Sequence, residues 1–126
     1  MVAAHGTVAA ALVDAVGRIA GRAAAFRAVS NEGLDAAALE AVLRHALAEH
    51  GAHVVFTDLP AGSCTMAARR IARSDPNIAV VTGASVGMLL DFALGTAAGR
   101  ADLDRATVRG REAMIVFPPS GGPGAA

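Results

Sequence analysis

Short apolar runs alternate along this chain with longer segments in which apolar residues recur at helical spacing. Such alternation is typical of strands and helices that follow one another, and no repeat or internal linker interrupts it. Runs of strand length cover residues 1–4, 25–29, 53–57 and 78–82. The last run is apolar almost throughout, which is expected where helices cover both faces of a sheet. We therefore predict an α/β fold, with a doubly wound, mostly parallel sheet of four or five strands and helices on both faces.

Capping residues and helical spacing predict the helices between these strands. A first helix is expected between Thr7, an N-cap residue, and Gly21, and a second between Asp35 and Gly51. Three more are predicted over residues 63–73, 85–96 and 102–114. The helical faces predicted for the first two consist of Val8, Leu12, Val16 and Ile19, and of Leu39, Val42, Leu43, Ala46 and Leu47.

The C-terminal part of the chain changes in character after the last predicted helix. Residues 115–117 have the composition of a short fifth strand, at a sheet edge or on a partner. Pro118 and Pro119 end regular structure, and residues 118–126 are predicted to form a disordered tail. A chain of 126 residues is the size of one ordinary domain, which we place over residues 1–117.

Composition excludes several classes of function. Eleven basic residues balance eleven acidic ones, so no net field attracts nucleic acid, and the lack of Trp and Tyr argues against base stacking. The longest uncharged stretch, residues 78–90, is too short to span a bilayer. The single Cys64 cannot form an internal disulfide, and no basic segment precedes an apolar stretch at the N-terminus. We therefore expect a cytoplasmic protein.

Two polar residues close two of the strand-like runs. His5 follows the first run and Asp58 follows the third, and Asp58 leads into Gly62-Ser63, which reads as a turn that opens a helix. Because the carboxyl ends of neighbouring parallel strands meet at one edge, an imidazole, a carboxylate and an anion-binding helix start are expected to meet there.

The chemistry of that combination points to phosphoryl transfer. A neutral imidazole is a nucleophile near pH 7, and its nitrogen is also a good leaving group. A carboxylate bonded to one ring nitrogen turns the lone pair of the other outward, so His5 and Asp58 are the predicted catalytic residues. The predicted phosphate-binding residues are Gly6, Gly62, Ser63 and Thr65, through backbone amides and the two hydroxyls.

Each of these residues also has a simpler interpretation. A histidine before a glycine is usually a loop residue, Asp58 alone would be a turn or cap residue, and Gly62-Ser63 is a common helix start. Cys64, near the same helix start, is interpreted as a packing residue because no basic partner accompanies it, although a reactive thiolate is the alternative.

Two further clusters carry weaker signals. His45, His50 and His53 do not have the spacing of a zinc site, so neither a metal nor a cofactor is predicted. Arg69, Arg70 and Arg73 are interpreted as a solvated helix face, on the side from which a partner could approach the site.

The ordered set of these features resembles a known family. The stretches that carry the resemblance are His5-Gly6, residues 56–70 (FTDLPAGSCTMAARR), residues 81–83 (VTG), residues 88–92 (MLLDF) and residues 110–112 (GRE). They are similar, in order and spacing, to the IIA component of the mannose/fructose/sorbose-type sugar phosphotransferase system, particularly its galactosamine-type branch. The similarity covers the chain from residue 1 to about residue 117.

The resemblance implies a doubly wound sheet and a histidine that takes phosphate from the phosphocarrier HPr and hands it to a IIB domain. His5 matches that histidine, Asp58 the aspartate that bonds its ring, and Ser63 the serine of the phosphate loop. The resemblance also implies a homodimer that exchanges a C-terminal antiparallel strand, here residues 115–117, and contact with a membrane permease at most at its periphery.

The chain departs from the family pattern at several positions. Ala61 stands where a second glycine is common, and Cys64 where many members have proline. Ser85 and Gly87 replace the usual Asn and Pro after the fourth strand. Only four residues precede His5, which indicates a trimmed first strand or a start further upstream.

The leading hypothesis is therefore an enzyme of the phosphotransferase class, a phosphohistidine carrier that serves a sugar permease. The alternative is a regulatory or sensory IIA-like binding module that is not coupled to transport. A IIA-like subunit for dihydroxyacetone phosphorylation is a third interpretation, which residues 56–70 fit less well.

Overall fold

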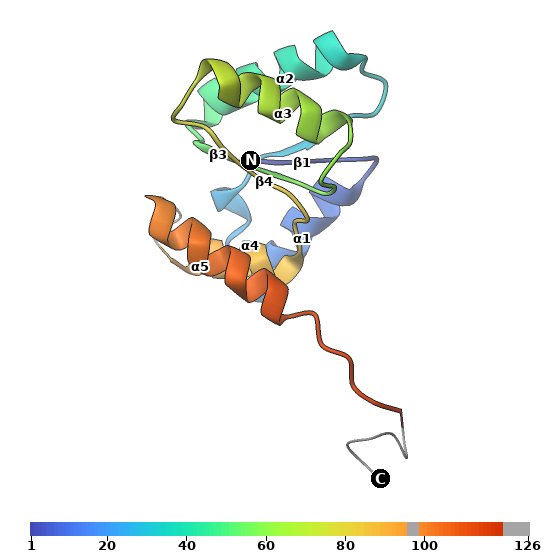
Figure 1. Ribbon diagram of the computed structural model, residues 1–126, viewed down its shortest axis with the longest axis vertical. Helices are drawn as coiled ribbons and strands as arrows, with labels where there is room; N and C mark the ends of the chain where they lie inside the picture. The colour runs from blue at the N-terminus through green and yellow to red at the C-terminus, as the bar shows by residue number, and fades with distance from the viewer. Residues whose placement is uncertain (96–98, 120–126) are drawn as a thin grey trace.

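Five α-helices surround four parallel strands in the computed structural model, which describes residues 1–95 and 99–119 (Figure 1). The strands lie in the order β2-β1-β3-β4. Their bounds are Val2–Ala4 for β1, Ala28–Ser30 for β2, Val54–Thr57 for β3 and Ala79–Val81 for β4. The predicted parallel α/β sheet is confirmed with four strands, and β1 is indeed short, since it pairs with β2 over three residues.

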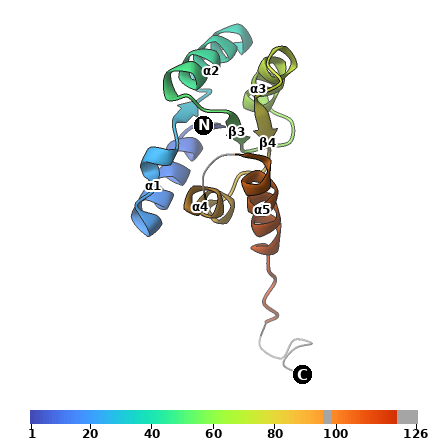
Figure 2. The same ribbon diagram turned by 90° about the vertical axis from the view of Figure 1, so that its left-hand side faces the viewer.

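Helices cover both faces of this sheet, as predicted. One layer holds α2 (Ala36–His50) and α3 (Ser63–Ser74), and the other holds α1 (Val8–Ala20), α4 (Val86–Leu94) and α5 (Gly99–Glu112). Figure 2 shows the two layers on opposite sides of the strands. Among the described residues, no helix combines the length and the apolar character that a membrane crossing requires.

Strand residues alternate between two buried clusters. Ala3 and Val55 belong to the cluster under α2 and α3, whereas Val2 and Phe56 belong to the cluster on the side of α1 and α4. All four side chains are fully buried. Because helices cover both faces of the sheet, strand residues on either face are mostly apolar, which explains the nearly continuous apolar runs in the sequence.

Three phenylalanines fill the cluster on the side of α1 and α4. The ring centroid of Phe56 lies 6.2 Å from that of Phe26 and 5.1 Å from that of Phe92, both in edge-to-face geometry. Phe26 and Phe92 are also in contact, at 6.4 Å. This triad joins β3 to α4 and to the segment before β2.

The predicted helix ends are largely confirmed. The carboxylate of Asp35 accepts a hydrogen bond from the backbone N–H of Ala38 at 2.8 Å and caps α2. Gly21 and Gly51 end α1 and α2 in the left-handed conformation, which glycine adopts without strain. Thr7 precedes α1 as predicted, but its side chain makes no capping bond.

Some predicted details are wrong. Val16 and Leu39 are buried as predicted, but Val8, Ile19 and Val42 of the same predicted faces are exposed. In α1 the small Ala9 is buried as well. The second strand starts three residues later than predicted, since residues 23–25 form a single 3₁₀ turn closed by the Phe26 N–H.

The last helices also differ in their bounds. The predicted helices over 85–96 and 102–114 correspond to α4 and α5, but α5 begins earlier, at Gly99, and ends at Glu112. The predicted end of the first of them, Thr96, lies outside the described residues.

Residues 115–117 are not a strand in this chain. Val116 and Phe117 are 91% and 82% exposed, because α5 carries the chain away from the sheet (Figure 1). Residues 118 and 119 have no regular structure, and residues 120–126 of the predicted tail lie outside the described residues.

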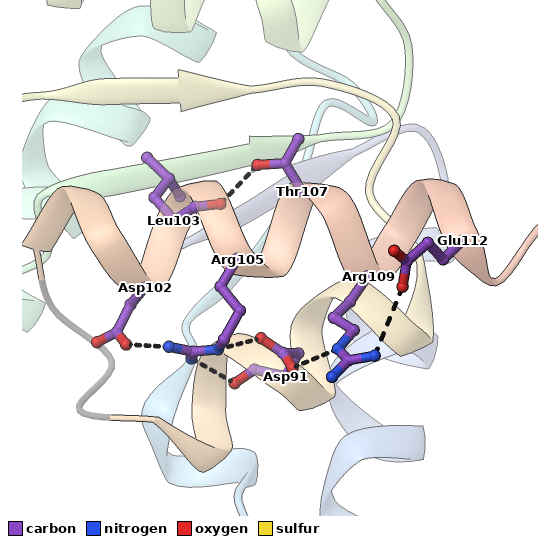
Figure 3. Close-up of polar contacts among 7 residues, drawn as sticks. All are labelled: Asp91, Asp102, Leu103, Arg105, Thr107, Arg109 and Glu112. Carbon is purple, nitrogen blue, oxygen red and sulfur yellow. Dashed lines mark hydrogen bonds and ion pairs between the residues drawn. The ribbon is translucent and has the colours of Figure 1, made fainter.

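A polar network holds α5 on α4 (Figure 3). Asp91 of α4 accepts a hydrogen bond from Arg105 Nε at 2.8 Å and lies 3.7 Å from Arg109 Nε. Arg105 also donates to Asp102 at 2.7 Å, and Arg109 lies 3.5 Å from Glu112. Asp91 is thereby the point on α4 that two arginines of α5 share.

The Phe triad makes a testable contribution to stability. Phe92→Ala removes a buried ring and leaves a cavity beside Phe56, so the free energy of unfolding should fall by about 3–5 kcal/mol. Urea unfolding followed by far-UV circular dichroism measures this. The control is Ile19→Ala, which truncates a side chain that is 64% exposed and should change the same quantity by less than about 0.5 kcal/mol. Equal effects of the two changes would contradict the assigned core.

Candidate functional site

The two predicted catalytic residues meet at the carboxyl end of the sheet. One carboxylate oxygen of Asp58, Oδ2, accepts a hydrogen bond from the backbone N–H of His5 at 3.0 Å and lies 2.8 Å from the ring Nδ1 of His5. The residues are 53 positions apart in the chain, and the parallel pairing of β1 with β3 brings them together.

This contact fixes the state of both side chains. Burial acts to raise the pKa of the Asp58 carboxyl, but hydrogen bonds from the backbone and ring of His5 outweigh it and hold the pKa below its usual value. An ionised carboxylate can only accept, so Nδ1 must carry the proton. The lone pair of neutral His5 is therefore on Nε2.

The other edge of the His5 ring faces the loop between β3 and α3. A Cβ atom at Gly62 would lie 3.1 Å from Cε1 of His5 and 3.7 Å from Nε2. The tight spacing favours glycine at this position, because a Cβ atom would press against the His5 ring. The Gly62 φ of 175° is extended backbone and sets no such preference. At Gly6, by contrast, a φ of +56° is what favours glycine, because the chain turns sharply from β1 toward α1.

The amino end of α3 begins next to this ring edge. The first helical hydrogen bond runs from Met66 N–H to Gly62 O at 2.9 Å, so the preceding amides in the first turn have no acceptor within the helix. Gly62 provides no side-chain cap for them. These amides, from Ser63 onward, can donate to an anion bound at Nε2.

Thr65 does not bring its hydroxyl to this site. The residue is buried, and its hydroxyl lies 2.6 Å from the hydroxyl of Thr57 and donates to the carbonyl of Leu59. The Thr65 side chain therefore links the β3–α3 loop to β3. Its single hydroxyl hydrogen is used by Leu59, so the hydroxyl cannot at the same time donate the predicted hydrogen bond to a phosphate.

Sequence analysis missed Asn31 as part of the site. Its Oδ1 accepts from the Gly6 N–H at 3.3 Å, and its Nδ2 donates to the Ser63 hydroxyl oxygen at 3.1 Å. Asn31 directly follows β2 just as His5 follows β1, and β1 and β2 are neighbours. That equivalent position after a neighbouring strand is the sequence signal that could have identified it.

The other reactive side chains take no part in this arrangement. Burial and the charge of Asp58 raise the pKa of the Cys64 thiol, which argues against a thiolate nucleophile. His45 lies 3.0 Å from Glu49, away from the site. Within residues 1–95 and 99–119, no three His, Cys, Asp or Glu side chains gather in a way that could hold a metal ion.

The three arginines of α3 are divided in their contacts. Arg70 donates to Glu40 of α2 at 2.7 Å and joins the two helices that cover one face of the sheet. Arg69 and Arg73 line a shallow cavity beside Pro60 and Thr82, next to the edge strand β4. The predicted solvated face therefore includes one arginine that is engaged in helix packing.

The lowered pKa of Asp58 makes stability depend on pH. A carboxyl whose pKa is lower in the folded state contributes stability above its unfolded pKa, which is about 3.9, and loses that contribution as the pH falls below it. We expect wild type to be more stable than Asp58→Asn at pH 5, with the difference shrinking steadily below about pH 4. Urea unfolding at several pH values measures this. A difference that stays constant down to pH 2.5 would contradict the assigned hydrogen bonds between His5 and the ionised Asp58 carboxylate.

Comparisons with known proteins identify a family and a fold. The model of one protein family, described as PTS system fructose IIA component, matches residues 1–108. A search of curated protein sequences finds no match.

Solved structures show the same fold. A phosphotransferase system component EIIA from Streptococcus agalactiae is 17% identical and has a TM-score of 0.79, with 92% of this chain and 94% of that chain covered. A mannose/sorbose-specific IIA subunit from Enterococcus faecalis is 21% identical and has a TM-score of 0.78, with 94% of this chain and 92% of that chain covered. A PTS IIA protein associated with the fucose utilization operon of Streptococcus pneumoniae is 17% identical with a TM-score of 0.78, over 91% and 89%.

Proposed function

Because the chain belongs to the family of PTS system fructose IIA components, we propose that His5 carries a phosphoryl group between two proteins of a sugar phosphotransferase system. The donor is the phosphocarrier HPr and the acceptor is a IIB domain. The protein works in the cytoplasm, at most at the periphery of a membrane permease. The narrower similarity to the galactosamine-type branch stays a prediction.

The contact between His5 Nδ1 and Asp58 Oδ2, at 2.8 Å, is the observation that carries this proposal. With Nδ1 protonated, the Nε2 lone pair attacks the phosphorus atom of the phosphoimidazole on the donor. The bond from phosphorus to the donor nitrogen breaks, and that nitrogen leaves with the electron pair. The His5 ring gains positive charge in the product, which the ionised Asp58 stabilises.

Transfer to the next protein reverses the same step. A nucleophile of the acceptor attacks phosphorus, the bond from phosphorus to Nε2 breaks, and the ring recovers its lone pair. Negative charge on the phosphoryl oxygens is balanced by the amides at the start of α3 and by the Ser63 hydroxyl. The His5 side chain is 42% exposed, which lets a side chain of another protein reach it.

The central test is acceptance of phosphate. Incubation with Enzyme I, HPr and phosphoenolpyruvate should give a label on the chain that is stable to base and labile to acid. His5→Ala should abolish the label because it removes Nε2. His45→Ala, which changes an exposed histidine on α2, is the matched control and should be labelled as wild type. A labelled His5→Ala variant would falsify the assignment.

Asp58 has a separate kinetic test. Asp58→Asn keeps the shape of the side chain but no longer provides the charge that holds the Nδ1 proton. We expect the rate of transfer from phosphorylated HPr to fall by ~10- to 100-fold, with the circular dichroism spectrum unchanged. Rapid-quench kinetics measures the rate, and an unchanged rate would remove Asp58 from the mechanism.

We also propose a homodimer in which residues 115–117 pair antiparallel to β4 of a second copy. Strand β4 lies at the edge of the sheet, and a groove of about 950 Å³ runs between it and α5. Met114, Val116 and Phe117, beyond the end of α5, are apolar and exposed. An edge strand and a free apolar segment are the two halves of a strand-addition interface.

The dimer has a direct test. Val116→Asp places a charge in the proposed strand, and sedimentation equilibrium should then show the mass of a monomer where wild type shows that of a dimer. Ile19→Asp is the control, because it puts the same charge at an exposed apolar position on α1. Two variants that sediment alike would contradict the proposed strand exchange.

A further inference from the structure

Asn31 joins the two loops on either side of the His5 ring. Its own backbone is fixed first, since its N–H donates to Ala4 O at 3.3 Å and its carbonyl accepts from Leu34 N–H at 3.1 Å. The side chain then contacts Gly6, in the turn after β1, and Ser63, at the start of α3. The Asn31 side chain thus connects three segments at the site: the segment after β2, the turn after β1 and the start of α3.

The chemistry of these partners fixes the orientation of the amide. A backbone N–H can only donate, so the atom that faces Gly6 must be the acceptor Oδ1. This places Nδ2 at Ser63, 3.1 Å from the hydroxyl oxygen. Turning the amide over would lose the hydrogen bond from the Gly6 N–H, which only donates, and would make Oδ1 an acceptor of the Ser63 hydroxyl hydrogen instead.

The orientation of Asn31 in turn determines what Ser63 can do. Nδ2 only donates, so the Ser63 oxygen receives a hydrogen from it and keeps its own hydroxyl hydrogen for another acceptor. Ser63 follows Gly62, whose backbone lies against the Cε1–Nε2 edge of His5. A phosphoryl group bound to Nε2 would present oxygens on that side that can accept this hydrogen.

We propose that Asn31 is a positioning residue that holds the Ser63 hydroxyl as a donor to the phosphoryl group on His5. This inference rests on the proposed phosphocarrier function. Asn31 acts through Ser63, so removing the Asn31 side chain should slow the transfer step as much as removing the Ser63 hydroxyl does.

A double-mutant cycle tests this dependence. The phosphoryl donor is phosphoramidate, a small compound with an N–P bond that releases ammonia, so the rate of His5 labelling requires no protein partner. We expect Asn31→Ala and Ser63→Ala each to slow labelling about three- to tenfold. The double variant should be no slower than Ser63→Ala alone. Additive losses in the double variant, or an unchanged rate in Asn31→Ala, would overturn the proposal.

A second variant separates positioning from folding. Asn31→Asp keeps an acceptor for the Gly6 N–H, but its carboxylate also accepts the hydroxyl hydrogen of Ser63. Labelling should therefore be slowed at least as much as in Asn31→Ala. The melting temperature should stay near that of wild type. Asn77→Ala, at an exposed asparagine in the turn before β4, is the matched control and should label normally. Normal labelling of Asn31→Asp would also overturn the proposal.

The two proposals fail in different ways. If the chain is not a carrier in a phosphotransferase system, HPr will not label it, whereas phosphoramidate will still label His5 and the cycle can still be measured. If Asn31 does not act through Ser63, HPr will label wild type and the cycle will be additive.

Discussion

The bond from His5 to Asp58 is the interaction on which the rest of the site depends, and sheet register determines it. Ala3 pairs with Thr57 across the parallel strands, so Asp58 lies level with Ala4, one residue before His5. At that offset a single carboxylate oxygen reaches both the backbone N–H and the ring of the histidine. A shift of one residue in register would turn the carboxylate toward the opposite face of the sheet.

The strands provide the buried core, and the loops that follow them carry the polar groups of the site. The strands are short and mostly apolar, and their residues pack into two clusters of buried hydrophobic side chains. All of the polar chemistry follows the last residue of a strand, where the backbone turns outward. Polar groups there are held by hydrogen bonds between loops, such as that from the Gly6 N–H to Asn31 Oδ1. The hydroxyls of Thr57 in β3 and Thr65 in α3 bond to each other beside the β3–α3 loop. The sheet thus acts as a rigid frame for groups that must stay in place during the proposed phosphoryl transfer.

Much of this arrangement could be predicted from the sequence, because strand and helix periods, Asp35 and two glycines are local signals. The meeting of His5 with Asp58 was also predictable, since parallel strands end at one edge. The role of Thr65 was not, because a threonine in a helix start has the same sequence signal whether it points toward a ligand or into the core. Asn31 escaped for a related reason, as its importance lies in contacts with residues 25 and 32 positions away. Residues 115–117 show the limit clearly, since an apolar run becomes a strand only where a neighbouring strand is within reach.

The partial exposure of the His5 ring, at 42%, has a consequence for the lifetime of any phosphorylated form. A ring that a second protein can reach is one that water can reach too. Phosphorylated molecules would therefore lose their phosphoryl group slowly by hydrolysis whenever the acceptor protein is scarce. If His5 carries phosphate as proposed, the steady abundance of the phosphorylated form would report the balance between the supply of phosphoryl groups and the demand for them.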